Sequence, residues 1–215
     1  MGFTIRAASP TDLPSIATLD IAAHKPTSAL LNMNLLPPDD IHALYLSRYA
    51  HFLSQPDCYR FLVAITSKNE TTHGGDIAGF LVGARPKLES FEEDEWNPVF
   101  PEDAPAEKIA WFSGLMKLMK EDKMKYFKND MWELEALATS PSCQHRGVGS
   151  LLLTHWLQEV DIAHGTLYVR ASPSGRGLYE KLGCVNKGEH SVDVSDHGWT
   201  QPIVNTNMIR AAKGT

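Results

Sequence analysis

The chain has 215 residues, of which 43% are hydrophobic and 21% are charged, and its formal net charge is −6. This length and composition are typical of a globular protein with a real core, and they exclude disordered, collagen-like and disulfide-scaffold classes. Because the chain is acidic and has no run of lysine and arginine, it offers no long-range attraction to a phosphate backbone, and we expect no nucleic-acid partner.

The cysteines and the N-terminus bear on the cellular compartment. Cys58, Cys143 and Cys184 are odd in number and show no Cys-x-x-Cys spacing, which disfavours a disulfide framework and a thiolate metal site and favours a reducing compartment. The N-terminus has no apolar stretch of signal-peptide length, and no apolar run approaches the roughly 20 residues that span a bilayer. We therefore expect a cytoplasmic protein without membrane association, with the nucleus open as a second compartment.

The first part of the chain alternates strand and helix signals. Ser9-Pro10-Thr11-Asp12 precedes an apolar helical stripe and predicts a capped helix start. A second stripe of helical spacing follows Pro37 and should end before Pro56. Short runs rich in β-branched and aromatic residues, bounded by turn residues, predict a strand at 3–7 and an antiparallel hairpin of strands at 59–65 and 76–83.

The middle of the chain contains an insertion at about 85–130. Residues 85–108 include four prolines and the acidic run 92–95, and they predict a long loop. Residues 106–124 have apolar side chains at helical spacing with lysines on the other faces. We expect a helix that packs on the core and whose lysines are solvated.

The remaining elements follow at short intervals. Neither a linker nor a repeat divides the chain, so we expect residues 1–215 to form a single mixed α/β (α+β) domain. The predicted elements are strands at 131–139, 166–171, 185–194 and 203–210, and helices at 149–161 and 174–182.

A glycine-bearing turn joins the strand that ends at Thr139 to the following helix. Gly147 and Gly149 allow the backbone to curl so that several N–H groups point at one spot, where the helix N-terminus adds about half a positive charge. The pattern lacks the third glycine of a dinucleotide fingerprint and the lysine of a P-loop. It indicates a different anion site or, as the alternative, a purely structural turn.

Two motifs resemble those of the GNAT superfamily of N-acetyltransferases. Gln144-x-x-Gly147-x-Gly149, directly after Leu-Ala-Thr-x-Pro, resembles the coenzyme A signature of that superfamily. The run from Thr166 to Ser172, followed by Tyr179-Glu180-Lys181-Leu182-Gly183, resembles its second motif. The usual asparagine of the second motif is replaced by Ser172, and the usual terminal phenylalanine by Cys184, which weakens the expectation of a contact to the pantetheine arm.

The resemblance implies a fold, a cosubstrate and a set of binding residues. The fold is the GNAT acyl-CoA N-acyltransferase fold, a twisted, mixed, mostly antiparallel sheet flanked by helices, whose fourth and fifth strands splay apart near Leu137. Acetyl-CoA would be the cosubstrate, with its pantetheine arm along Leu137, Ala138 and Thr139 and its pyrophosphate at Gln144, His145, Arg146, Gly147, Val148, Gly149 and Ser150. Ser172 and Tyr179 would also contact the cofactor.

Glu133 and Glu135 are the candidate general bases. An amine of pKa about 10.4 is uncharged in only about one molecule in 10³ at pH 7, so a positioned base assists acetyl transfer. Strand alternation predicts that both glutamates share a face with Leu137 and Thr139 and that Leu134, Ala136 and Ala138 lie opposite. The position of Glu133 resembles that of the base in the histone acetyltransferases of the superfamily. We slightly favour Glu135, because it lies nearer the splay; the alternative is that both glutamates only pair with neighbours.

The family tyrosine matches Tyr179, which would protonate or hydrogen-bond the sulfur of the departing coenzyme A. The alternative for this residue is an aromatic core position with a satisfied hydroxyl. The nine histidines include no His-x-x-x-His pair on a recognisable helix, so we expect no metal site.

The acceptor amine is the open part of this prediction. The resemblance implies direct transfer of the acetyl group to the primary amine of a small molecule or peptide; the alternatives are a protein N-acetyltransferase and a catalytically silent coenzyme A-binding regulator. The acidic run 92–95 could attract a polyamine or could be a solvated loop. The sequence has no signal for an oligomeric state. Candidate acceptor-site residues are His24, Met33, Asn34, Tyr45, Trp96 and Trp199.

Overall fold

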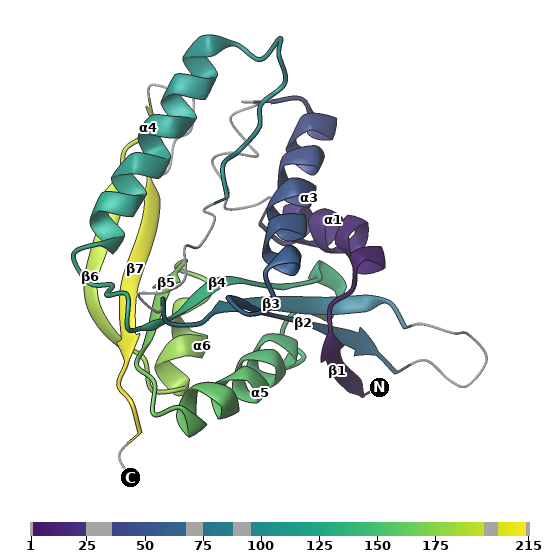
Figure 1. Cartoon of the computed structure of the whole chain (residues 1–215), viewed down its shortest axis with the longest axis vertical. Helices are drawn as coiled ribbons and strands as arrows, with labels where there is room; N and C mark the ends of the chain where they lie inside the picture. The colour runs from purple at the N-terminus through teal and green to yellow at the C-terminus, as the bar shows by residue number, and fades with distance from the viewer. Residues whose placement is uncertain (1, 25–35, 68–74, 88–95, 196–201, 214–215) are drawn as a thin grey trace.

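The protein, seen in a computed structural model, is built on a seven-stranded sheet with the strand order β1-β2-β3-β4-β5-β7-β6 (Figure 1). The structure describes residues 2–24, 36–67, 75–87, 96–195 and 202–213. Only β4 and β5 pair in parallel; the other neighbours are antiparallel. The strands are β1 (Phe3–Ala7), β2 (Tyr59–Thr66), β3 (Ile77–Ala84), β4 (Trp132–Thr139), β5 (Leu167–Ala171), β6 (Val185–Val192) and β7 (Ile203–Arg210).

Helices cover both faces of the sheet. Figure 1 shows α1, α3 and α4 on one side and α5 and α6 on the other. The strand pair β6 and β7 runs upward beside α4. The helices are α1 (Leu13–His24), α3 (Pro38–Ser54), α4 (Ala106–Lys123), α5 (Val148–Ile162) and α6 (Arg176–Lys181), with short 3-10 turns at Pro10–Asp12 and Pro141–Cys143.

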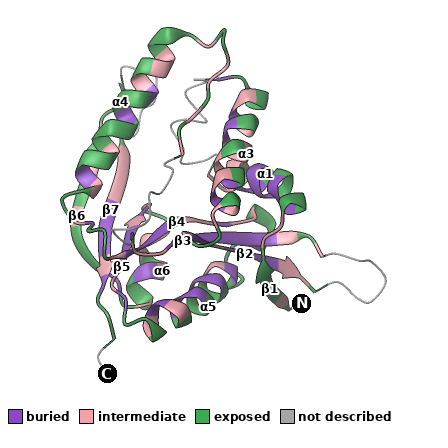
Figure 2. Cartoon of the chain, in the orientation of Figure 1, coloured by how far each residue is buried: buried purple, intermediate pink, exposed green. Residues whose placement is uncertain are grey.

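A hydrophobic core lies on each face of the sheet. On one face, α5 buries Leu152, Leu153 and Trp156 against β2 to β5. On the other, Tyr49 of α3 packs at 5.0 Å between ring centroids on Phe80 of β3. Figure 2 shows the buried residues concentrated along β2 to β5 and α5, whereas β6 at the sheet edge is largely exposed. The central strands are therefore covered on both faces, and this packing fixes the relative positions of β4 and β5.

The sheet opens between β4 and β5. Their pairing is limited to Trp132–Leu134 opposite Leu167–Val169, although β4 continues to Thr139 and β5 to Ala171. Past these pairs the two strands diverge and leave backbone groups facing a gap. The twisted, mixed, mostly antiparallel sheet with diverging central strands, which the family resemblance implies, is confirmed.

The predicted elements match the structure closely. The helix at 106–123 inside the insertion is confirmed, as are the strand and helix that flank the glycine turn. The acidic run 92–95, within the predicted long loop, lies outside the described residues. Within the described ranges, none of the helices is both long enough and apolar enough to cross a lipid bilayer.

Candidate active site

The first part of the site is the turn between β4 and α5. Gly147 caps α5 with φ of +84°, and His145 also has a positive φ, of +58°. The first backbone bond of the helix runs from the Leu151 N–H to the Gly147 carbonyl, at 2.9 Å. The N–H groups of the three residues before Leu151 therefore have no acceptor within the helix, and they lie where its dipole is positive. This arrangement is suited to a phosphate.

The glycine turn lies next to the gap in the sheet. A Cβ atom added to Gly149 would lie 3.4 Å from Leu178 of α6, 3.6 Å from the Thr139 hydroxyl and 3.9 Å from Leu137. These contacts show that α5, α6 and the unpaired end of β4 meet at this point. Leu137 and Thr139 of the predicted pantetheine segment thus lie beside Gly149 of the predicted pyrophosphate segment, and the residues from Gln144 to Gly147 are exposed.

The end of β5 forms the opposite wall of the gap. A Cβ atom added to Gly175 would lie 3.4 Å from the Ser172 hydroxyl and 3.6 Å from the Tyr179 hydroxyl, so these two groups are neighbours. Ser172 accepts the Gly175 N–H at 3.3 Å. Burial raises the pKa of Tyr179, so its phenol keeps its proton at neutral pH. The structure therefore brings Ser172 and Tyr179 together beside the gap.

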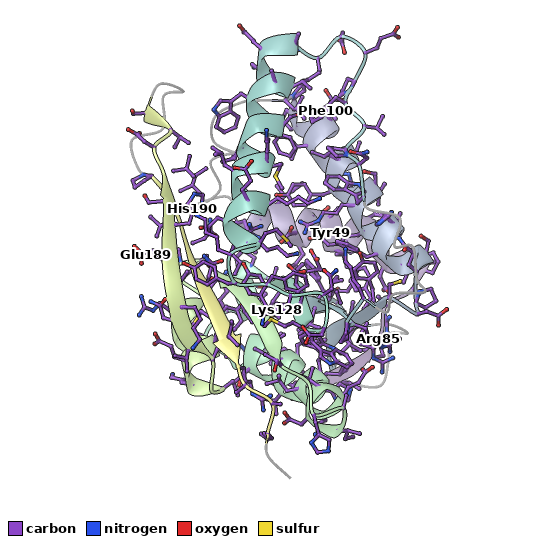
Figure 3. All side chains as sticks on the ribbon, turned by 60° about the vertical axis from the view of Figure 1, so that its left-hand side comes forward. Tyr49, Arg85, Phe100, Lys128, Glu189 and His190 are labelled. Atoms are coloured by element: carbon purple, nitrogen blue, oxygen red, sulfur yellow. The ribbon has the colours of Figure 1, made fainter. Side chains whose placement is uncertain are left out.

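On the α3 and α4 side of the sheet lies a cavity of about 650 Å³. Its floor is formed by Glu133 and Glu135 of β4 and by Arg170 of β5, and its walls come from α3, α4 and the segment before α4. In Figure 3 the labelled Phe100 lies among the side chains between α3 and α4. Its ring contacts Phe112, a lining residue, at 5.5 Å between centroids. The cavity is thus an aromatic and aliphatic chamber with charged groups at its base.

The two glutamates have different surroundings. Glu133 is buried and forms an ion pair with Lys123, whereas Glu135 lies 3.6 Å from the Arg48 guanidinium. Burial raises the pKa of Glu133 to about 7, and the charge of Glu135 adds to this rise, while Lys123 opposes it. A carboxyl group with such a pKa exchanges protons near neutral pH, as a general base must.

The predicted strand alternation holds for the two glutamates but fails beyond them. Val82 of β3 pairs with Ala136, and the next residue, Gly83, pairs with Leu134, so Glu135 is the extra residue of a β-bulge. After the bulge, Ala136 and Ala138 pack in the same core as α1 and α3, and Leu137 packs in the core with α5. The prediction that Leu137 and Thr139 share the face of the glutamates is therefore wrong. The bulge turns the glutamates toward the cavity and the cofactor-side residues toward α5.

Helix α4 contributes more to the cavity than its sequence indicates. Lys123 is only 21% exposed and pairs with Glu133, and Lys120 also lines the cavity, so the expectation that all lysines of this helix are solvated is wrong. The end of α4 is held on the sheet by Asp122, which accepts a hydrogen bond of 2.7 Å from Asn207 of β7. No sequence motif links these residues to the glutamates, because the contact exists only once α4 is packed.

Only some of the acceptor-site residues named from the sequence line the cavity. Tyr45 and Trp96 line the cavity. His24 is not among the lining residues; its Nδ1 pairs with the buried Asp20 at 2.7 Å, and this partner raises its pKa. Met33, Asn34 and Trp199 lie outside the described residues. Arg48, Lys123 and Arg170 line the cavity and are not among the sequence candidates.

The part of the chain that the structure describes holds no candidate metal site. Across the described ranges, His, Cys, Asp and Glu do not gather in groups of three or more that could hold a metal ion. The three cysteines are free, and Cys143 and Cys184 are buried.

Comparison with known proteins identifies the architecture. Residues 106–183 match the family described as Acetyltransferase (GNAT) domain. No curated protein sequence matches the chain. Among solved structures, arylalkylamine N-acetyltransferase 2 from Aedes aegypti aligns with a TM-score of 0.66 and 14% identity, over 99% of this chain and 100% of that one.

Two further structures share the fold at full length. A protein described as histone acetyltransferase HPA2 and related acetyltransferase, from Corynebacterium glutamicum, has a TM-score of 0.62 and 20% identity, with 100% of this chain and 99% of that one covered. PaiA N-acetyltransferase from Thermoplasma acidophilum, solved in complex with coenzyme A, has a TM-score of 0.54 and 14% identity, with 98% and 99% covered. The family match covers residues 106–183, the segment that carries both motifs, and the solved structures share the fold over the whole length of the chain.

Proposed function

We propose that this protein is an N-acetyltransferase that moves the acetyl group of acetyl-CoA to the primary amine of a small molecule or peptide by direct attack. The observation that supports this most strongly is the gap between β4 and β5. An anion-binding helix terminus lies at one side of the gap, and a cavity with two glutamates lies at the other. A thioester delivered from the helix side through the gap would meet an amine held in the cavity.

The cofactor would bind mainly through backbone groups. Its pyrophosphate would accept hydrogen bonds from the N–H groups at the start of α5, and its pantetheine amides would pair with the free edge of β4 from Leu137 to Thr139. The complex of the Thermoplasma protein with coenzyme A supports this choice of cosubstrate at the level of the fold.

The two glutamates would prepare the acceptor for attack. An ammonium group entering the cavity must lose a proton before its nitrogen can attack the thioester carbonyl carbon. Glu133, whose pKa of about 7 is close to neutral pH, takes this proton. Glu135 lies one residue beyond the last β4–β5 pair, and its charge sustains the raised pKa of Glu133. The weak preference for Glu135 that the sequence suggests therefore changes to a preference for Glu133.

The leaving group would receive its proton on the other side of the gap. As the C–N bond forms and the C–S bond breaks, the sulfur of coenzyme A becomes a thiolate. Tyr179 keeps its proton at neutral pH because its ring is buried, and it donates this proton to the sulfur. The nitrogen loses one proton to a glutamate before the attack and a second as the amide forms; the second, passed through solvent, replaces the proton that Tyr179 gives to the sulfur, and the glutamate releases the first, so protons and charge balance.

Two measurements test this function. Calorimetry with acetyl-CoA should show binding, and a thiol-release assay over a panel of amines, amino acids and peptides should show turnover with at least one acceptor. No binding at millimolar acetyl-CoA would overturn the proposal. Binding without turnover on the whole panel would instead favour a coenzyme A-binding regulatory protein.

A further inference from the structure

We propose that the acceptor cavity contains an anion subsite at Arg170, so that the acceptor is an amine with a free carboxylate and a large apolar group, as in an aromatic amino acid. This inference rests on the proposed function and names its substrate class. Four features support it: the basic lining of the cavity, the lack of a direct ion pair at Arg170, its position at the gap and the apolar walls.

The described lining of the cavity contains more basic than acidic side chains. Its described lining residues include six basic side chains but only two carboxylates, although the whole chain has a net charge of −6. Basic side chains in a lining attract a substrate with an anionic group where they are not already paired within the protein. The basic residues are Arg48, Arg85, Lys87, Lys120, Lys123 and Arg170.

Three of these cations already face a carboxylate of the protein. The distances are 3.6 Å from Arg48 to Glu135 and 2.8 Å from Arg85 to Glu159, and Lys123 pairs with Glu133. In Figure 3, the labelled Arg85 lies near the base of α3. Their charges are largely compensated within the protein, so they are poor candidates for holding a substrate anion.

Arg170 differs from these three residues. Among the residues that the structure describes, its guanidinium makes a single hydrogen bond, from Nη1 to the Met119 carbonyl oxygen at 3.0 Å, and no direct ion pair, although its charge acts on the nearby Glu133. A guanidinium has five N–H donors in a planar fork that matches a carboxylate. The remaining donors of Arg170 are thus available to an anionic group in the cavity.

The position of Arg170 fits a substrate that carries both an amine and a carboxylate. Val169 and Leu134 are the last paired residues of β5 and β4, and Arg170 and Glu135 each follow one residue later. Both side chains line the cavity where the gap begins. In an α-amino acid, one carbon atom joins the amine to the carboxylate. A carboxylate held at Arg170 would therefore place the amine next to the glutamates and the gap.

The walls of the cavity suit the rest of such a substrate. The side of α4 that faces the cavity presents Phe112, Met116 and Met119, and α3 presents Tyr45 and Phe52. A volume of about 650 Å³ lies within the usual range of small-molecule sites, about 300 to 1,000 Å³. Apolar walls above a charged floor favour an aromatic or thioether side chain that points away from the sheet.

Ligand pairs that differ only in the carboxylate test the subsite. Calorimetry on the full chain, alone and with coenzyme A, compares L-phenylalanine with 2-phenylethylamine and L-tryptophan with tryptamine. We expect the amino acid of each pair to bind about ten- to a hundredfold more tightly, the range of a charge-assisted pair of hydrogen bonds. With acetyl-CoA present, the ratio of kcat/KM within each pair should follow the same order.

Variants of Arg170 show whether this residue produces the preference. Arg170→Gln should reduce the ratio of the two dissociation constants to about one, and Arg170→Lys should keep part of it, because the charge remains and the fork is lost. Lys117→Gln removes one positive charge from an exposed site on α4 outside the cavity and should keep the wild-type ratio. Thermal unfolding of each variant identifies any that fail to fold.

The outcomes separate this inference from the proposed function. Equal or tighter binding of the decarboxylated amines, or a preference that survives in a folded Arg170→Gln variant, would overturn the subsite. Failure of both members of each pair to bind the wild type would overturn the substrate class. The proposed function fails by a different result, the absence of acetyl-CoA binding.

Discussion

The two sides of the gap between β4 and β5 are constructed in different ways. On the α5 side, the candidate cofactor site comes largely from one continuous run, residues 137–150, and it uses backbone N–H and C=O groups. On the α3 and α4 side, the cavity draws its lining from residues between Leu44 and Arg170, and it uses side chains. The first depends on local backbone conformation and the second on tertiary packing.

This difference explains why one side can be predicted from the sequence. A backbone anion site needs a turn that only certain residues permit, so Gly147 at φ of +84° leaves a pattern in the sequence. A side-chain cavity needs only that suitable residues meet, and many sequences achieve that. Substitutions that impair either the cofactor site or the acceptor cavity, and leave the other intact, therefore measure how independent the two sites are.

The largest effect should come from the acceptor side. Replacing Glu133 by Gln removes the group that accepts the proton of the amine, and kcat/KM at pH 7 should fall by about 10² to 10⁴. Part of the loss should return at alkaline pH, where more amine is uncharged. Steady-state assays across pH check this, with Glu121→Gln, at an exposed position of α4, as the matched control.

The corresponding Glu135→Gln variant compares the two glutamates. We expect a smaller loss, because its charge acts on Glu133 while Glu133 takes the proton. A larger loss in Glu135→Gln than in Glu133→Gln would reverse their roles. Wild-type rates in both variants would leave deprotonation to the solvent.

The second effect should come from the cofactor side. Gly147→Val places a β-branched residue at a left-handed backbone position, which costs at least about 1 to 2 kcal/mol locally and turns the N–H groups away from the phosphate. We expect the dissociation constant for acetyl-CoA to rise by about a hundredfold or more, since several such bonds are lost together. Calorimetry measures it, and Gly114→Val, on α4 with nothing within 4 Å of its added Cβ, serves as the control. Near-normal affinity in Gly147→Val would mean that the phosphate lies elsewhere.

A smaller effect on catalysis should come from replacing Tyr179, beside the gap. Tyr179→Phe removes a proton donor to a thiolate that forms only late in the reaction, so kcat should fall by about 10- to 100-fold with little change in the affinity for acetyl-CoA. The matched variant is Tyr126→Phe, at a ring that lies next to Gly188 of β6, away from the gap. An unchanged kcat in Tyr179→Phe would assign this ring to the core alone.

The elements themselves could be predicted because their signals are local. Apolar spacing, prolines and glycines suffice to place β4, α4 and α5 within a residue or two. The bulge at Glu135 leaves no such signal, since it reflects how β4 matches β3, and it moves Leu137 to the other face. Strand alternation alone therefore assigns the first half of β4 correctly and the second half wrongly.

The electrostatics of the cavity could not be predicted for a related reason. Lys123 has the sequence context of a solvated lysine near the end of a helix. It meets Glu133 because Asn207, which lies 85 positions after Asp122 in the chain, holds the end of α4 on the sheet. An ion pair of this kind depends on contacts from three separate elements, and no local pattern encodes it.

The smallest predicted effect tests this ion pair directly. Lys123 lowers the pKa of Glu133, so Lys123→Met should raise that pKa above its value of about 7. Because the base acts only when ionised, the acid limb of the kcat/KM profile should move to higher pH, by about one unit, and activity should recover above the new pKa. Lys117→Met, on the exposed part of α4, should leave the limb in place. A limb that stays near pH 7 in Lys123→Met would show that the ionisation seen in the profile belongs to another group, and the acceptor side would then work without the contact that α4 supplies.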